Sequence, residues 1–182
     1  GDSKQMPPSQ FFSSTTDSIT LLNQADSVFK SHLLTWHYRS EHPKLMQFSN
    51  QHFYDDELCY FPSVSDQNPI ELLKIRNGIF EDGKNINEAV RVAKMYESLL
   101  KTGVRNIAII AFSKEQEKQI EKEILKLNLS INNELLIRNL ENSQGIERDV
   151  VVVSVGYGFN TGGQFRMSFG PLNQDYGANR LN

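Results

Sequence analysis

Residues 106–112 form an almost uninterrupted apolar run, and a helix signature lies on each side of it. Such a run is typical of a strand that is buried on both faces, as in a parallel sheet. Upstream, Asn85 with Glu88 three residues later has the pattern of a helix capping box. Downstream, Ser113 with Gln116 repeats that pattern directly after the run. A buried strand between two capped helices predicts an α/β architecture.

Strands and helices alternate along most of the chain. Periodicity and capping residues predict helices at 18–26, 43–53, 85–101 and 113–127. Apolar runs predict strands at 33–36, 70–80, 106–112, 134–137 and 149–155, the second of them interrupted at Asn77-Gly78. Alternation of this kind implies parallel pairing with helical crossovers. We therefore expect an α/β domain in which helices flank a mainly parallel central sheet.

Composition excludes several classes of protein. A length of 182 residues suits one domain of ordinary size. No apolar run approaches the roughly 20 residues of a membrane span, so we expect no membrane association. The lone Cys59 excludes an internal disulfide framework and fits a reducing compartment, so we expect a cytoplasmic protein. The net charge of −3 argues against a small sequence-specific DNA-binding domain, but it is compatible with a groove for a single strand.

The first five residues include an acid and an amide, Asp2 and Gln5. A loop with these groups can sit at the γ-phosphate of ATP, with Asp2 near the metal shell. Gln5 would then bond a phosphate oxygen or the attacking water, because its dipole can do so without adding charge. The alternative is a polar loop that leads into the turn at Pro7-Pro8, since five residues specify little.

Tyr38 and Arg39 follow a predicted strand and precede a predicted helix. This places them at the carboxyl end of the strand, where open α/β sheets bind ligands. Arg39 could act as an arginine finger that stabilises charge on a transferred phosphoryl group. Tyr38 offers a ring on which adenine could stack. The alternative is that Arg39 pairs with a surface carboxylate and Tyr38 fills an edge of the core.

A tight turn is expected before the four valines at 150–153. Gly145 permits a positive φ and a close approach of the backbone to a ligand. Glu147 could accept hydrogen bonds from ribose hydroxyls, while Asn142 and Ser143 could hold nucleic-acid phosphates. The alternative is an ordinary turn with solvated charges.

Phe112 and Ser113 end the apolar strand and open the next helix. They could add a stacking ring and a phosphate contact to a nucleic-acid site. Core packing and helix capping explain both residues at least as well. The four histidines lack metal-ligand spacing, so we expect no metal site within this chain. The sequence also has no Gly-rich phosphate loop that ends in Lys-Ser or Lys-Thr.

In this order and spacing, the motifs resemble the region from motif III to just before motif VI of the superfamily 1 DNA/RNA helicases. The resemblance covers nearly the whole chain and extends to residues 169–173 and to Asn179-Arg180-Leu181-Asn182. In that family a Leu-Asn of this kind leads directly into motif VI. More narrowly, several segments resemble large bacterial helicase-like proteins with an AAA-type ATPase core. These segments are His37-Tyr38-Arg39-Ser40, His42-Pro43, Phe48-Ser49-Asn50, His52-Phe53-Tyr54 and residues 154–158.

The resemblance implies a P-loop NTPase-type fold, namely the second RecA-like domain (2A) of a pair. Residues 28–182 would form that domain, and residues 1–27 would be the motif III loop and linker from the first RecA-like domain. ATP and Mg²⁺ would bind between the two domains. Hydrolysis would then drive the protein along a single strand of DNA or RNA.

The resemblance also implies roles for individual residues. Gln5 would sense the γ-phosphate, Tyr38 would flank the adenine, and Arg39 would be one of two arginine fingers. Glu147 would contact the ribose, and Asp2 belongs to the same motif as Gln5. We expect the side chains at 5, 39 and 147 to converge along the carboxyl edge of one sheet.

Some parts of the family pattern are missing or altered. The phosphate loop and most Mg²⁺ ligands would precede Gly1, and the arginine of motif VI would follow Asn182. We therefore expect this chain alone to bind ATP weakly and to hydrolyse none. Ala111-Phe112-Ser113 also stands where many relatives have Thr-Pro-Tyr. A second hypothesis is a RecA-like module that has lost catalysis and serves protein interaction or regulation.

Overall fold

The structure is a computed structural model that describes residues 2, 4, 5, 21–63, 67–131, 133–165, 168–173 and 177–182. Most of the predicted loop at 1–27, including the Pro7-Pro8 turn, lies outside the described residues. The chain divides into two compact units, Gly1–Leu72 with Asp175–Asn182 (unit 1) and Leu73–Gln174 (unit 2). The boundary predicted after residue 27 would separate a loop of the first RecA-like domain from the second domain. It stays a prediction.

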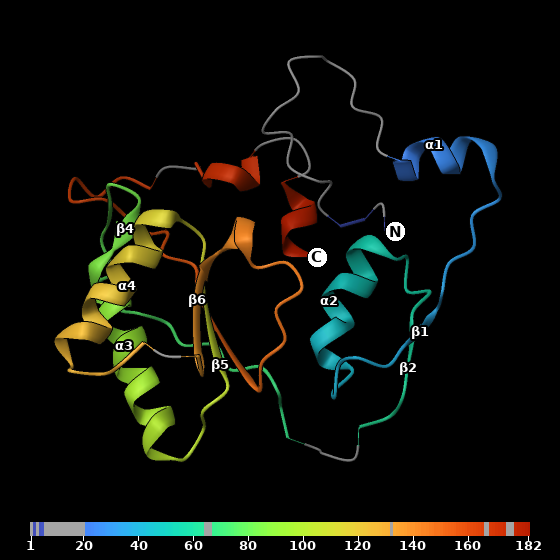
Figure 1. Cartoon of the computed structure of the whole chain (residues 1–182). Helices are drawn as coiled ribbons and strands as arrows, with labels where there is room; N and C mark the ends of the chain where they lie inside the picture. Colours follow the sequence, from blue (N-terminus) through green and yellow to red (C-terminus); the bar gives the residue numbers. More distant parts are fainter. Residues whose placement is uncertain are drawn as a thin grey trace. The chain divides into compact units, whose positions relative to one another are not determined.

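Unit 2 is built on a three-stranded parallel sheet, as the alternating pattern predicted (Figure 1). The central strand β5 (Ile107–Ala111) pairs on one side with β6 (Leu135–Asn139) and on the other with β7 (Val150–Ser154). Ile109 of β5 lies opposite Ile137 of β6 and opposite Val152 of β7. The apolar run at 106–112 is therefore the middle of the sheet, where a strand needs no polar face.

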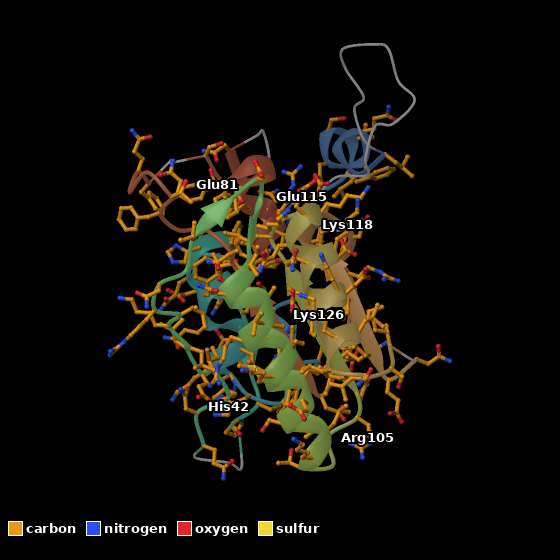
Figure 2. All side chains as sticks on the ribbon, turned by 90° about the vertical axis from the view of Figure 1, so that its left-hand side faces the viewer. His42, Glu81, Arg105, Glu115, Lys118 and Lys126 are labelled. Carbon is orange, nitrogen blue, oxygen red and sulfur yellow. The ribbon has the colours of Figure 1, made fainter. Side chains whose placement is uncertain are left out.

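Helices α3 (Ile86–Lys101) and α4 (Lys114–Lys126) lie together against one face of this sheet (Figure 1). Their apolar stripes form the core with the inward side chains of the strands. The fully buried members of this core are Ala89, Ala93, Tyr96, Ile107, Ile109, Ala111, Ile120 and Ile124. The two helices begin at the same end of the sheet, which Glu81 and Glu115 mark in Figure 2, while Arg105 marks the opposite end. The predicted fold class is confirmed.

Both predicted capping residues are confirmed. The side chain of Asn85 accepts a hydrogen bond from the backbone N–H of Glu88, and that of Ser113 accepts one from the N–H of Gln116. In a capping box, the third residue of the helix returns its side chain to its own cap. Here Gln116 instead crosses to the other helix and accepts from the N–H of Asn85 at 2.7 Å. One helix therefore completes the cap of the other.

The hydrogen bond between Asn85 and Gln116 is part of a larger buried polar network. The Nε2 atom of Gln116 donates to the carbonyl of Asn85 at 3.3 Å and to the hydroxyl of Ser154 at 3.1 Å. Ser154 donates to the carboxylate of Glu88 at 2.7 Å, which also accepts from the N–H of Gly156 at 2.9 Å. Both helix starts are thereby fixed to the carboxyl end of β7. The network can be buried at little cost in free energy because each of its polar side chains has a hydrogen-bond partner.

The strand predicted at 70–80 is wrong over most of its length. Here the structure has a short antiparallel pair, β3 (Phe80–Glu81) with β4 (Lys84–Asn85), and a single bridge between Ile79 and Phe159. Asn77 adopts a left-handed backbone with φ 60°, and the side chain of Leu72 is 91% exposed. An apolar segment without a neighbouring strand has no ladder to join, so periodicity alone misled the prediction.

Unit 1 contains helices α1 (Leu21–Val28) and α2 (Lys44–Phe53), and a two-stranded parallel ladder of β1 (Trp36–His37) with β2 (Cys59–Tyr60). Its last element is a 3₁₀ helix, Ala178–Leu181. Asn50, which is 3% exposed, organises the turn after α2. Its side chain accepts from the N–H of Leu58 at 2.9 Å and donates to the carbonyl of Leu58 at 3.2 Å.

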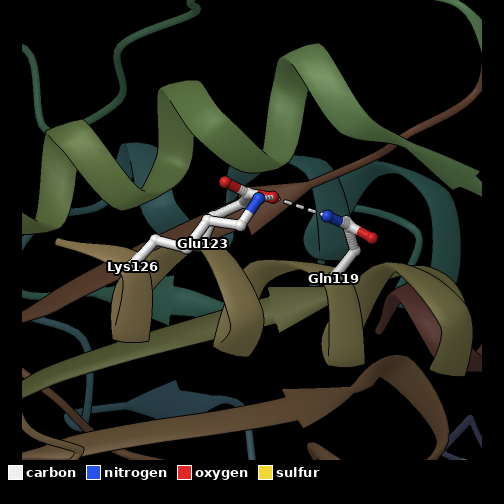
Figure 3. A network of polar contacts seen from close by, with 3 residues as sticks. All are labelled: Gln119, Glu123 and Lys126. Carbon is white, nitrogen blue, oxygen red and sulfur yellow. Dashed lines mark hydrogen bonds and ion pairs between the residues drawn. The ribbon is translucent and has the colours of Figure 1, made fainter.

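We predict that Gln116→Leu lowers the free energy of unfolding by about 2–4 kcal/mol, because it leaves buried partners on Asn85 and Ser154 unsatisfied. Gln119→Leu is the matched control, three residues along the same helix. Gln119 bonds Glu123, which in turn contacts Lys126, in a partly exposed network (Figure 3). The control should cost less than about 1 kcal/mol. Urea unfolding followed by circular dichroism measures both, and equal losses would contradict the role given to Gln116.

Candidate nucleotide and nucleic-acid residues

The four candidate residues of unit 1 lie around one pocket. Its volume is about 940 Å³, and its lining includes Asp2, Gln5, Tyr38 and Arg39. The sequence places these residues in two motifs more than thirty positions apart, and the fold of unit 1 brings them to a shared cavity. Their individual roles stay predictions.

A short hydrogen-bonded turn presents Tyr38 and Arg39 at the end of β1. The backbone N–H of Ser40 donates to Nε2 of His37 at 3.0 Å, and the Ser40 hydroxyl lies 2.9 Å from the same atom. The ring of Tyr38 is 86% exposed, so it does not fill a core edge and has free surface for stacking. Arg39 lies close enough to His37 for its charge to lower the pKa of the imidazole.

The loop that carries Asp2 and Gln5 is shaped by its own acid. Oδ1 of Asp2 accepts from the N–H of Lys4 at 2.9 Å, and Oδ2 accepts from the hydroxyl of Tyr54 at 2.6 Å. Both carboxylate oxygens therefore have partners from the protein. Asp2 is placed to hold the loop that carries Gln5.

In unit 2, four candidate residues lie at the carboxyl ends of β5 and β6. Phe112 follows β5, and its ring meets that of Tyr157 edge-on at 6.2 Å. The hydroxyl of Ser113 caps α4 and donates to the carbonyl of Gly83. Asn142 ends a 3₁₀ turn (Leu140–Asn142), and the hydroxyl of Ser143 donates to the carbonyl of Leu140 at 2.8 Å. The contacts of Phe112 and Ser113 therefore fit core packing and helix capping, which are the alternative to nucleic-acid binding.

Gly145 and Glu147 lie on the connection from β6 to β7. Gly145 has φ +78°, as predicted, and a Cβ added there would meet no atom within 4 Å. Glu147 is exposed, and two residues later the N–H of Asp149 bonds the carbonyl of Asn106, just before β5 begins. The connection thus runs from the carboxyl edge of the sheet to its amino edge. Glu147 lies near the amino edge, unlike the residues after β5 and β6, so the expected carboxyl edge is wrong for this residue. The expectation of one sheet is also wrong for Arg39, because Arg39 follows β1, which belongs to a separate two-stranded ladder.

Sequence reasoning missed three residues around the loop that carries Asp2 and Gln5, namely Tyr54, Asn179 and Asn182. Nδ2 of Asn182 donates to Tyr54 at 2.9 Å and to the carbonyl of Lys4 at 3.1 Å, and Nδ2 of Asn179 donates to the carbonyl of Gln5 at 3.3 Å. The only signal in the sequence was that Tyr54, Asn179 and Asn182 belong to segments that resemble the helicases. No spacing rule connects them to residues 2–5.

The described part of the chain holds no group of three or more His, Cys, Asp or Glu side chains that could bind a metal ion. Asp2, the one candidate near a metal shell, is already bonded through both oxygens. The residues that the structure describes therefore do not by themselves make a Mg²⁺ site. Among the described helices, none is long and apolar enough to span a bilayer.

We predict that unit 1 loses stability in mild acid through His37. Nε2 accepts the N–H of Ser40, so the ring must be neutral there, and burial followed by the charge of Arg39 lowers its pKa below 6.5. The unfolded state then binds more protons below pH 6.5, so stability is complete above that pH and falls as the pH drops through the folded pKa. His37→Gln should flatten the dependence of the melting temperature on pH between 7 and 5. His32→Gln is the control, and an unchanged slope in His37→Gln would refute the assignment.

Comparison with known proteins finds one family match and two relatives. Residues 73–161, which lie within unit 2, match the protein-family model described as an AAA domain. The chain is 31% identical over 216 aligned residues to the uncharacterized ATP-dependent helicase MG140 of Mycoplasma genitalium. It is 30% identical over 218 residues to the MG140 homolog of Mycoplasma pneumoniae.

Each alignment covers the whole chain but only 19% of the relative's length. The chain therefore corresponds to one part of much longer proteins. The chain is thus similar, over its whole length, to one part of two ATP-dependent helicases, and its residues 73–161 match an AAA domain.

Proposed function

We propose that this chain is the C-terminal motor domain of an ATP-dependent superfamily 1 helicase or translocase. The observation that carries the proposal is the shared pocket of unit 1, which brings Asp2, Gln5, Tyr38 and Arg39 together. The identity to two ATP-dependent helicases over the whole chain supports the same class of reaction. The reaction would be hydrolysis of ATP coupled to movement along single-stranded DNA or RNA.

In this proposal each of the pocket residues has its own role toward the nucleotide. The guanidinium of Arg39 stabilises the negative charge that builds up on the γ-phosphoryl group as it leaves. The amide of Gln5 bonds a γ-phosphate oxygen or the attacking water. Tyr38, with its ring exposed, stacks on the adenine. The first RecA-like domain would supply the phosphate loop and the Mg²⁺ ligands from the opposite side.

We also propose that candidate residues of unit 2 bind ribose and nucleic acid. Glu147 is exposed on the connection before β7 and can accept hydrogen bonds from ribose hydroxyls. Asn142, Ser143 and the backbone around Gly145 offer polar groups to phosphates. Phe112 and Ser113 are the weaker candidates, because their rings and hydroxyls already serve contacts within the unit.

We predict that Arg39→Ala, in the complete protein, lowers kcat for ATP hydrolysis by about 10³-fold or more, because it removes charge stabilisation from the transition state. Arg39→Lys should restore little, since a lysine lacks the planar fork of donors. Arg105→Ala is the control, because Arg105 is exposed and bonds the backbone at Leu100 and Val104. ATPase assays with and without single-stranded DNA or RNA measure the effect. Full activity in Arg39→Ala would refute the finger.

The same assay separates the second hypothesis. If the unmodified protein turns over no nucleotide but binds protein partners, the domain is a RecA-like module retained for interaction or regulation. The proposal instead requires turnover that rises with single-stranded nucleic acid.

We also predict that Glu147→Ala removes the preference for ribose. The unmodified protein should have a KM for ATP about tenfold below its KM for 2′,3′-dideoxyATP, the value of roughly one lost hydrogen bond. In Glu147→Ala the two KM values should become equal, because the acceptor of the hydroxyl protons is gone. Glu141→Ala, on the preceding 3₁₀ turn, is the control. A preference that survives Glu147→Ala would exclude this role.

A further inference from the structure

Separate stretches of unit 1 meet at the hydroxyl group of Tyr54. The hydroxyl donates to Oδ2 of Asp2 at 2.6 Å, and it accepts from Nδ2 of Asn182 at 2.9 Å. The side chain of Gln5 also bonds it. One phenol oxygen therefore contacts the acid of the sensor loop, the sensor amide itself and the segment at 177–182. The pocket lined by Gln5 and Arg39 is lined by Tyr54 and Asn182 as well.

Tyr54 is anchored by the helix that precedes it. It is the C-cap residue of α2, and its backbone N–H donates to the carbonyl of Asn50 at 3.1 Å. The buried side chain of Asn50 fixes the following turn through both backbone groups of Leu58. A tyrosine has only two side-chain torsions to order, so an anchored backbone gives its oxygen a defined position. The phenol is the fixed side of the contact and the loop is the side that it holds.

The protonation state of Tyr54 suits the role of a donor. Burial raises the pKa of its hydroxyl above the usual value, and the hydrogen bond to Asp2 raises it further, while the bonds from Asn182 and Gln5 act in the opposite direction. The hydroxyl therefore keeps its proton at neutral pH. It gives that proton to the carboxylate and leaves its lone pairs to the two amides.

We propose that Tyr54 is a positioning residue for the γ-phosphate sensor, holding the loop at 2–5 and the segment at 179–182 in one arrangement through Asp2, Gln5 and Asn182. This inference rests on the proposed function for the role of Gln5. Its consequence is that nucleotide sensing depends on a hydroxyl whose partners are protein groups on Asp2, Gln5 and Asn182. A sensor amide that is displaced by a small distance loses much of its effect on the rate.

The arrangement also couples two segments that the family pattern treats as separate motifs. Asn182 donates to both Tyr54 and the carbonyl of Lys4, and Asn179 donates to the carbonyl of Gln5. A movement of the sensor loop away from Tyr54 would therefore break contacts to the segment at 179–182 as well. The hydroxyl of Tyr54 is the group that contacts Asp2 and Gln5 of the loop and Asn182 of the other segment.

A double-mutant cycle in the complete protein tests the inference. Tyr54→Phe removes only the hydroxyl, and Asp2→Asn keeps the Oδ1 acceptor for Lys4 while removing the charge. Each single variant should lower kcat for ATP hydrolysis by about tenfold, the effect of one hydrogen bond to a charged group, and leave KM for ATP within about twofold. The double variant should be no slower than Tyr54→Phe alone, because loss of the hydroxyl already removes the contact that Asp2→Asn alters. Tyr96→Phe is the control, since the Tyr96 hydroxyl bonds Ser130 in unit 2 at 3.4 Å.

Hydrogen exchange provides a readout that does not depend on catalysis. In Tyr54→Phe the backbone amides of Lys4 and Gln5 should exchange about tenfold faster, because the loop loses its anchor. Unchanged exchange and unchanged kcat, or losses in kcat that multiply in the double variant, would overturn the positioning role. Faster exchange together with an inactive unmodified protein would keep the Tyr54 contact but overturn the sensor role and the proposed function. The two failures are therefore distinguishable.

Discussion

The side chain of Gln116 is the interaction on which unit 2 most depends. It lies 1% exposed between the starts of α3 and α4 and the end of β7. The side chain bonds Asn85 at the start of α3 and Ser154 at the end of β7, while the backbone N–H of Gln116 bonds Ser113, the cap of α4. A glutamine amide can do this because it both accepts and donates within one planar group. An apolar residue of similar size would fill the space but would leave the N–H of Asn85 without its hydrogen-bond acceptor. The geometry of the sheet's carboxyl end therefore follows from one buried amide.

A second buried amide has the corresponding position in unit 1. Asn50 fixes the turn after α2, which places Tyr54 as the cap of the helix and carries the chain into β2. β2 pairs with β1, and the residues that follow β1 are Tyr38 and Arg39. The proposed sensor and the proposed arginine finger therefore both depend on the same turn. This explains how two distant motifs come to line one pocket.

Much of the fold could be predicted because the signals were local. Local residue types were enough to predict the buried strand before Phe112, the helix caps at Asn85 and Ser113, and the positive φ of Gly145. The segment at 70–80 failed because its alternation required a neighbouring strand that no local rule could supply. For the site, spacing pointed to Gln5, Arg39 and Glu147 individually. It could not reveal Tyr54, because a hydrogen bond across 52 residues leaves no periodic trace.

The sequence alone determined the α/β class, the limits of the main helices and the resemblance to helicases, since each depends on short-range patterns of apolar and capping residues. Only the tertiary structure decided which side chains meet. It sent the side chain of Gln116 to the neighbouring helix, placed Glu147 near the amino edge of the sheet, and joined Asp2 to Tyr54 and Asn182. The physical reason is that a polar group binds whichever partner the packed backbone brings within about 3 Å, and that distance is set by the whole fold.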